Sequence, residues 1–458
     1  MNGTKVASAV LAVAAVWVAP TATAVTPPVV DDGRLPPAGP PAPRTPTLQT
    51  DPCATGGSAA GDVPPSNSGE LGPVWALTRG AGQTVAVIDT GVARHRLLPH
   101  LLPGGDYVST GDGTQDCDGH GTIVAGIIGA TPTEVAGSTF GGVAPDATIM
   151  AIRQSSNVFR PSDSTSGSGS GSGVGSGVGD VETLAMAVRT AADAGVTVIN
   201  ISSVACVDAD VGVADESLGA ALAYAVDVKN VVVVTAAGNV GGGGQCREQN
   251  PPPDPARPGV PSWDAVKVVV SPAWYDDYVL TVGSVDSAGR PSSFTLAGPW
   301  VDVAARGEDI VSLDPAGDGL TDVVPGSSGA EPISGTSYAA PFVAGIAALV
   351  RAVSPELTAR QVMRRIEETA HHPAAGWDPL MGHGVVDVLA AVSADGPLAS
   401  SVPVPPPIAP DPTAAAPTES GSRRVAFIGA AVCLGVATAA VSFSAGRLRR
   451  RGEPIADD

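Results

Sequence analysis

Between about residues 70 and 395 the sequence alternates short β-branched runs with longer helix-like stretches. Helical stretches such as 181–194 and 216–228 lie between runs that are typical of buried parallel strands: TVAVID (84–89), ATIMAIR (147–153), VTVINIS (196–202) and VVVVTAA (231–237). This alternation predicts an α/β fold with a mainly parallel sheet and helices on both faces. Sites in such sheets form at the carboxyl ends of strands, so the residues that follow these runs are the first candidates for chemistry.

Three polar residues stand at element boundaries beside glycines. Asp89 ends the run TVAVID, His120 lies in DGHGT before an apolar helical stretch, and Ser337 lies in GTSYAAP before another. A serine hydroxyl becomes a nucleophile when an imidazole takes its proton, and the imidazole needs a carboxylate to orient it. Asn239, in AAGN after the run 231–237, offers an amide donor for an oxyanion. Each residue alone is also consistent with a turn, a cap or a structural histidine; their joint occurrence favours catalysis.

The motifs VIDTGV, DGHGT and GTSYAAP resemble the three catalytic blocks of subtilisin-like serine proteases, in that family's order Asp, His, Ser. The resemblance covers about 80 to 390 and implies the subtilisin-like three-layer fold. It also implies that Asp89 orients the base, that His120 is general base and then acid, and that Ser337 is the nucleophile. AAGN is similar to the block that carries the family's oxyanion asparagine, here Asn239, which acts with the Ser337 backbone N–H.

One position departs from that family. Many subtilases read Ser-Leu-Gly after the strand that here reads VINIS, and this chain has Ser202-Ser203-Val204 instead. In the family this backbone lines the pocket for the residue before the cut. Val204 therefore predicts a reshaped wall and a restricted set of substrates.

Both ends carry targeting signals. Residues 1–24 combine Lys5, an apolar stretch and the small-x-small site Ala22-Thr23-Ala24, which predicts a signal peptide; a buried helix is the alternative, and Pro20 disfavours it. Residues 425–445 are 21 residues without a charge, roughly 31 Å of helix or one bilayer core. They could instead form a buried helix, but arginines flank them. The larger arginine cluster follows them, which predicts a single-pass span in the cell membrane with a cytoplasmic C-terminus and an extracytoplasmic catalytic domain.

These signals and the composition predict an order of segments along the chain. They are a signal peptide (1–24), a proline-rich N-terminal extension that wraps the catalytic domain (25–70), a peptidase domain (71–395) with a flexible Gly/Ser loop (162–179), a proline-rich linker (396–422), a transmembrane helix (423–446) and a cytoplasmic tail (447–458). The extension is too rich in proline to bury a core like a folded prodomain. A short inhibitory peptide removed on activation stays open, as does a substrate-gating role for the Gly/Ser loop.

Four of the five cysteines are expected outside the membrane, since Cys433 lies in the apolar span. Four exported cysteines suggest two disulfides, for which three connectivities exist. Cys206 and Cys246 each follow a predicted strand, so we expect Cys206–Cys246 and, by remainder, Cys53–Cys117. Cys117 lies three residues before His120, so its bridge to Cys53 would hold the extension near the active site. A Cys53–Cys206 bridge would contradict this arrangement.

Charge limits the partners. With 45 acidic and 25 basic residues the net charge is −20, so nothing neutralises a phosphate backbone and nucleic-acid binding is excluded. No carboxylates have calcium-loop spacing; the nearest group, Asp112 to Asp118, contains a cysteine and adjoins His120. We expect no metal and no cofactor.

The appendages narrow the resemblance. A signal peptide, a proline-rich N-terminal segment, four exported cysteines, a proline linker, one span and an arginine-led tail together resemble the mycosins, the membrane-anchored subtilases of actinobacterial type VII secretion systems. The segments 335–341 and 198–206 are similar to mycosin sequences. The resemblance implies a membrane-anchored serine endopeptidase acting on exported proteins beside membrane proteins of a secretion complex. The alternative is a mainly structural component that stabilises such a complex, with proteolysis secondary.

Overall fold

The computed structural model describes residues 25–55, 57, 68–135, 138–162, 177–241, 246–252, 254–326 and 329–393. Several predicted segments lie outside the described residues, wholly or for the most part: the signal peptide (1–24), the Gly/Ser loop (162–179), the linker (396–422), the transmembrane helix (423–446) and the cytoplasmic tail (447–458). These segments stay predictions.

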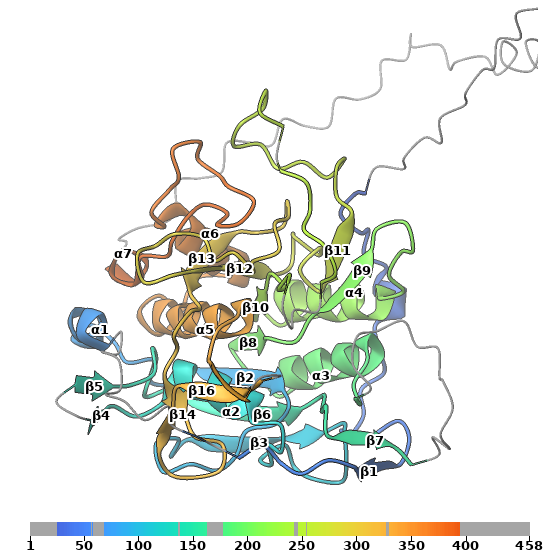
Figure 1. Cartoon of the computed structure of the whole chain (residues 1–458), viewed down its shortest axis with the longest axis vertical. Helices are drawn as coiled ribbons and strands as arrows, with labels where there is room; N and C mark the ends of the chain where they lie inside the picture. Colours follow the sequence, from blue (N-terminus) through green and yellow to red (C-terminus); the bar gives the residue numbers. More distant parts are fainter. Residues whose placement is uncertain are drawn as a thin grey trace, which may run out of the picture. The chain divides into compact units, whose positions relative to one another are not determined.

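A seven-stranded sheet runs through the body in the order β13-β12-β10-β8-β2-β6-β3, and every pairing in it is parallel (Figure 1). Its strands are β2 (Thr84–Asp89), β3 (Leu101–Asp106), β6 (Thr148–Arg153), β8 (Val198–Ile201), β10 (Val232–Ala236), β12 (Leu280–Val285) and β13 (Val303–Arg306). All residues of β8 and β10 are buried, as expected for strands covered on both faces. The predicted parallel sheet is confirmed, and four of its strands coincide with the predicted runs.

Helices cover both faces of this sheet. On one side α2 (His120–Gly129) packs against α5 (Thr336–Val353), and on the other α3 (Val181–Asp193) packs against α4 (Glu216–Ala223), which continues as η2 (Tyr224–Val228) (Figure 1). The remaining helices are α1 (Ser68–Trp75), α6 (Ala359–Glu368) and α7 (Val388–Ser393). This three-layer arrangement is the subtilisin-like fold expected from the motifs.

The helix α5 is apolar along most of its length. Among the described residues it is the one helix long and apolar enough to cross a membrane, and 78% of it is buried inside the body. It packs against β8, β10 and β12. The burial identifies α5 as a core helix of the catalytic domain, distinct from the span predicted at 423–446.

Short antiparallel pairs surround the sheet. They are β1 (Thr47–Gln49) with β7 (Phe159–Pro161), β4 (Thr133–Val135) with β5 (Ser138–Phe140), β9 (Ala205–Asp208) with β11 (Val268–Ser271), β14 (Ser312–Leu313) with β15 (Leu320–Thr321), and β16 (Val323–Gly326) with β17 (Gly329–Pro332). The pair β1–β7 joins the N-terminal extension to the body.

The described part of the extension, 25–55, runs along the body with η1 (Asp32–Arg34) and β1 as its regular elements. Val30 and Leu35 pack against the hydrophobic core. The disulfide Cys53–Cys117 fixes the end of this segment, and Cys206–Cys246 joins β9 to the segment after β10. This is the pairing that the sequence favoured.

Candidate active site

The three residues of the expected triad lie at the boundaries of their elements. Asp89 is the last residue of β2, His120 is the first residue of α2, and Ser337 is the second residue of α5. The rings of His120 and Tyr338 are 5.3 Å apart between centroids, which brings the start of α5 against the start of α2. The fold therefore gathers at one edge of the sheet residues that are far apart in the chain.

Asp89 and His120 form a direct pair. The His120 ring bonds through Nδ1 to Asp89 Oδ1 at 2.7 Å, and the same oxygen accepts from the Thr90 backbone N–H at 2.7 Å. Asp89 is fully buried, and within the described chain its Oδ2 has no hydrogen-bond partner. In the neutral ring, a carboxylate that accepts from Nδ1–H selects the tautomer with Nε2 unprotonated, which is the form required of a general base.

The surroundings of His120 favour its charged form. Burial lowers the pKa of the imidazole, but the charge and hydrogen bond of Asp89, followed by the charges of Asp116 and Asp118, raise it further, so the net pKa lies above its ordinary value. Tyr338 stays neutral beside it, because burial, with the charges of Asp89 and Asp116, raises the pKa of its phenol. An imidazolium that forms during a reaction is thus stabilised where it stands.

Two glycines in DGHGT allow α2 to begin close to β2. Gly119 precedes the helix with φ of 84°, in the left-handed region that other residues disfavour. A Cβ on Gly121 would collide with the carbonyl oxygen of Gly91 and lie 3.1 Å from the Cβ of Asp89. The close approach needed for the bond between Asp89 and His120 therefore explains the glycine after the histidine.

Ser337 is bonded to the strand end rather than to the histidine. Its hydroxyl donates to the Ser202 carbonyl oxygen at 3.0 Å, and the Ser202 hydroxyl donates to the Ser337 carbonyl oxygen at 2.8 Å. Asn200 orients Ser202 by donating to its hydroxyl oxygen at 2.9 Å. Within the described residues no hydrogen bond joins Ser337 to His120, so Ser337 must turn away from Ser202 before the imidazole can take its proton.

Asn239 lies just beyond β10, at the entrance to α5. Its Oδ1 accepts from the backbone N–H and the hydroxyl of Thr336, at 3.0 and 3.1 Å. Because both bonds use the amide oxygen, the Nδ2 amino group is left to donate elsewhere, as an oxyanion donor requires. Behind it, Cys246 Sγ lies 3.1 Å from where a Cβ on Gly238 would be, so the second disulfide supports this loop.

Three polar residues that bond to the expected triad or its neighbours were not among the site residues predicted from the sequence: Thr90, Asp116 and Ser202. Asp116 belongs to the acidic group considered as a metal loop, but its carboxylate accepts hydrogen bonds from this chain. Its position four residues before the histidine was the available signal. In the described part of the chain, no three His, Cys, Asp or Glu side chains come together in a way that could hold a metal ion.

A cavity of about 420 Å³ lies apart from these residues. It is lined by prolines and Trp377, and none of its lining residues belongs to the expected active site.

Comparison with known proteins identifies the family of this chain. The pattern of the Subtilase family matches residues 80–384, and the chain belongs to that family of serine proteases. Mycosin-4 of Mycobacterium tuberculosis is 55% identical over 454 residues, covering 96% of this chain and 95% of that protein. Within the family, this chain is a subtilisin-like protease of the mycosin type.

Two solved structures have the same fold. MycP3 protease from the type VII (ESX-3) secretion system matches with a TM-score of 0.74 and 47% identity, covering 81% of this chain and 100% of that one. A chain in the intact ESX-5 inner membrane complex matches with a TM-score of 0.75 and 40% identity, covering 92% of this chain and 100% of that one.

Proposed function

We propose that this protein is a serine endopeptidase in which Ser337 is the nucleophile, His120 the general base and acid, and Asp89 the residue that orients the base. The observation that carries the proposal is the 2.7 Å bond between His120 and the buried Asp89. A carboxylate held at Nδ1 sets the tautomer and stabilises the imidazolium, a role that a structural histidine does not need.

The reaction follows from these positions. Ser337 Oγ attacks the peptide carbonyl carbon while its proton passes to His120 Nε2, and the negative charge develops on the carbonyl oxygen. The Asn239 amino group and the Ser337 backbone N–H, near the start of α5, donate to that oxygen. His120 then gives the proton to the leaving amine, and a water activated by the same imidazole releases the acyl group from Ser337.

We further propose that the substrates are exported proteins and that the enzyme works beside a type VII secretion complex. Support comes from the similarity to MycP3 and to a chain of the ESX-5 inner membrane complex. The predicted signal peptide and span 423–446 fit a single-pass protein with an extracytoplasmic catalytic domain and a cytoplasmic C-terminus. Val204, half-buried directly before β9, fits a restricted substrate set.

The test is labelling of the full-length protein with a fluorophosphonate, which reacts with an activated serine. We expect labelling of the wild-type protein and none of Ser337→Ala, with both folded to the same extent by circular dichroism. Comparison of secreted proteins from cells carrying each form identifies the substrates. Equal labelling of both forms would show that another residue is the nucleophile.

A second candidate function is structural, and the match to a chain of an assembled inner membrane complex favours it. In this case the folded body itself stabilises the secretion complex. If Ser337→Ala restores secretion as fully as the wild-type gene does, and the wild type is labelled, then secretion depends on the folded body of the protein. Proteolysis would then serve a separate function.

A further inference from the structure

The carboxylate of Asp116 collects four hydrogen bonds beside the expected catalytic pair. Oδ1 accepts from the Thr90 hydroxyl and the Gly119 backbone N–H, both at 2.8 Å. Oδ2 accepts from the Thr122 backbone N–H at 2.8 Å and from the Thr122 hydroxyl at 2.6 Å. Each oxygen thus has two donors, and an ionised carboxylate is the side chain that can accept all four.

These donors come from the two segments that carry Asp89 and His120. Thr90 follows Asp89 directly, and its hydroxyl oxygen also accepts from the Gly121 backbone N–H at 3.0 Å. Gly119 and Thr122 belong to the start of α2 on either side of His120. Asp116 therefore bridges the end of β2 and the first turn of α2. These are the two segments that the bond between His120 and Asp89 also joins.

We propose that Asp116 positions His120. Its carboxylate holds both Thr90 and the first turn of α2, and in this way it fixes the imidazole relative to Asp89. The inference rests on the proposed protease function, and it concerns a residue that acts through His120 and does not touch the substrate.

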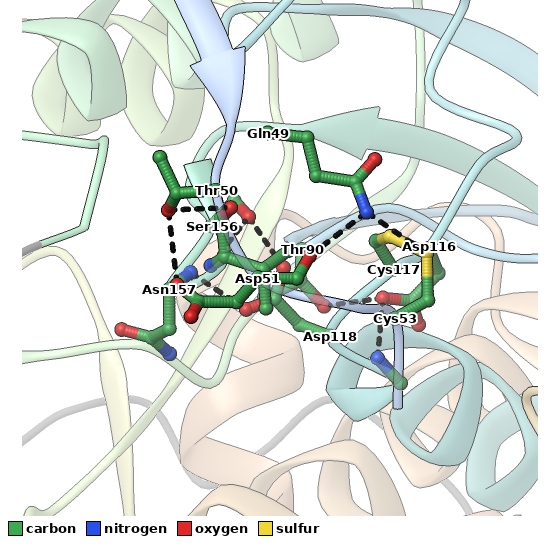
Figure 2. The surroundings of a disulfide bond; sticks show 12 residues. Gln49, Thr50, Asp51, Cys53, Thr90, Asp116, Cys117, Asp118, Ser156 and Asn157 are labelled. Carbon is green, nitrogen blue, oxygen red and sulfur yellow. Dashed lines mark hydrogen bonds between the residues drawn. A yellow bond between two sulfur atoms is a disulfide. The ribbon is translucent and has the colours of Figure 1, made fainter. Parts of the chain in front are cut away.

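The loop that carries Asp116 is anchored on its far side as well (Figure 2). Cys117 forms the disulfide to Cys53, and its carbonyl oxygen accepts from the Ala54 backbone N–H at 2.7 Å. Asp118 accepts from the Ser156 hydroxyl and the Asn157 backbone N–H, both at 2.6 Å. The neighbours of Asp116 are therefore fixed independently, and the carboxylate can act as a rigid support.

Asp118 supplies a matched control. It lies on the same loop, and its charge also raises the pKa of His120. However, each of its oxygens accepts from one donor only, and neither donor belongs to β2 or α2. The groups that act on the His120 charge are Asp89, Asp116 and Asp118, and the neutral Tyr338 ring packs against the imidazole. Asp116→Asn and Asp118→Asn remove the same charge with the same change of shape.

The substitutions differ in what they do to the hydrogen bonds. In Asp116→Asn either orientation of the amide places an NH2 group against two donors, so the first turn of α2 or Thr90 must shift. Misplacement of a catalytic group by about 1 Å costs up to roughly 100-fold in rate. We expect Asp116→Asn to slow fluorophosphonate labelling by about 10- to 100-fold, and Asp118→Asn to slow it less than about threefold.

Thr90 tests the same bridge without a change of charge. Thr90→Val keeps the shape and the Asp116 carboxylate but removes the hydroxyl, whereas Thr90→Ser keeps the hydroxyl. We expect slow labelling for Thr90→Val and recovery for Thr90→Ser. This pair tests the proposal even where Asp116→Asn fails to fold.

A readout independent of activity is the pKa of His120. It is measured by NMR on the full-length protein labelled at histidine Cε1, with His120→Gln to assign the signal. We expect Asp116→Asn to lower the His120 pKa more than Asp118→Asn does. If the wild type is not labelled but the two Asn variants still differ in the pKa of His120, the protease function alone is refuted and the positioning role stands.

Equal pKa changes in both Asn variants would overturn the positioning role. So would wild-type labelling rates in both Asp116→Asn and Thr90→Val.

Discussion

Removal of the disulfide Cys53–Cys117 tests whether the N-terminal extension is a permanent part of the folded enzyme. The perturbation is the double change Cys53→Ser with Cys117→Ser, which leaves neither partner of the bridge as an unpaired cysteine. The bridge spans a sequence separation of 64 residues, so in the chain-entropy model its loss frees about 14.5 cal/mol/K in the unfolded chain, or about 4.3 kcal/mol at 25 °C. The noncovalent contacts of the extension, such as the pair β1–β7, stay in place.

The expected shift in melting temperature follows from the size of the unfolding unit. Residues 25–393 are roughly 370 residues, for which the unfolding entropy is about 0.8 kcal/mol/K near the midpoint. Dividing the two values gives a fall in Tm of about 5 to 6 °C. The assay is thermal unfolding of the full-length protein in detergent without reductant, followed by circular dichroism.

The second disulfide provides the control. Cys206–Cys246 spans 40 residues within the body, and its removal should cost about 3.9 kcal/mol and a similar fall in Tm. The entropy gained in the unfolded chain destabilises the body only when the extension unfolds together with it. A Tm within about 1 °C of wild type for the first pair, with the expected fall for the second, would refute the idea that the extension belongs to the cooperative unit.

Three further outcomes follow from the active site. Ser337→Ala should abolish peptide hydrolysis while changing stability by no more than about 1 kcal/mol, measured by thermal unfolding. Asn239→Ala should lower kcat by roughly 10² to 10³ with KM nearly unchanged, as steady-state kinetics on a peptide substrate would report. Because the pKa of His120 lies above 6.5 and the base must be unprotonated, kcat/KM should rise with pH through a midpoint above 6.5, and Asp89→Asn should lower that midpoint. At pH values below the ordinary pKa of His120, its charged form stabilises the fold. This contribution is lost as the pH rises through the raised pKa of the folded state.

Much of the sheet could be predicted because buried parallel strands have a strong sequence signal. Apart from Asp89 and Asn200, β2, β8 and β10 consist of β-branched and other apolar residues, and the structure ends them within two residues of the predicted limits. β3 was not predicted, because LLPGGD contains one proline and two glycines, which disfavour strands. It forms at the edge of the sheet, where only β6 pairs with it and a register shift after Pro103 absorbs the irregularity.

The triad and its supporting residues differ in how well the sequence predicts them. Asp89, His120 and Ser337 lie in glycine-flanked motifs at element boundaries, where their types and order already indicate one chemistry. Asp116 has only its spacing from His120 as a signal, because a carboxylate in a loop is equally consistent with a cap, a turn or a metal ligand. Its role depends on Thr90, 26 residues away in the chain and in hydrogen-bond contact in the fold.

In the proposed site the base already contacts its carboxylate, whereas the proposed nucleophile is bonded elsewhere. The bond between His120 and Asp89 is already formed, whereas the Ser337 hydroxyl donates to the Ser202 carbonyl oxygen. Breaking that bond costs at most the net contribution of one hydrogen bond, about 0.5 to 1.5 kcal/mol, and the new bond to His120 then offsets a similar amount. A factor of about ten in rate corresponds to 1.4 kcal/mol, so this resting position slows the reaction by no more than about tenfold. The bond of Ser337 to Ser202 is therefore too weak to hold the proposed nucleophile in an off state.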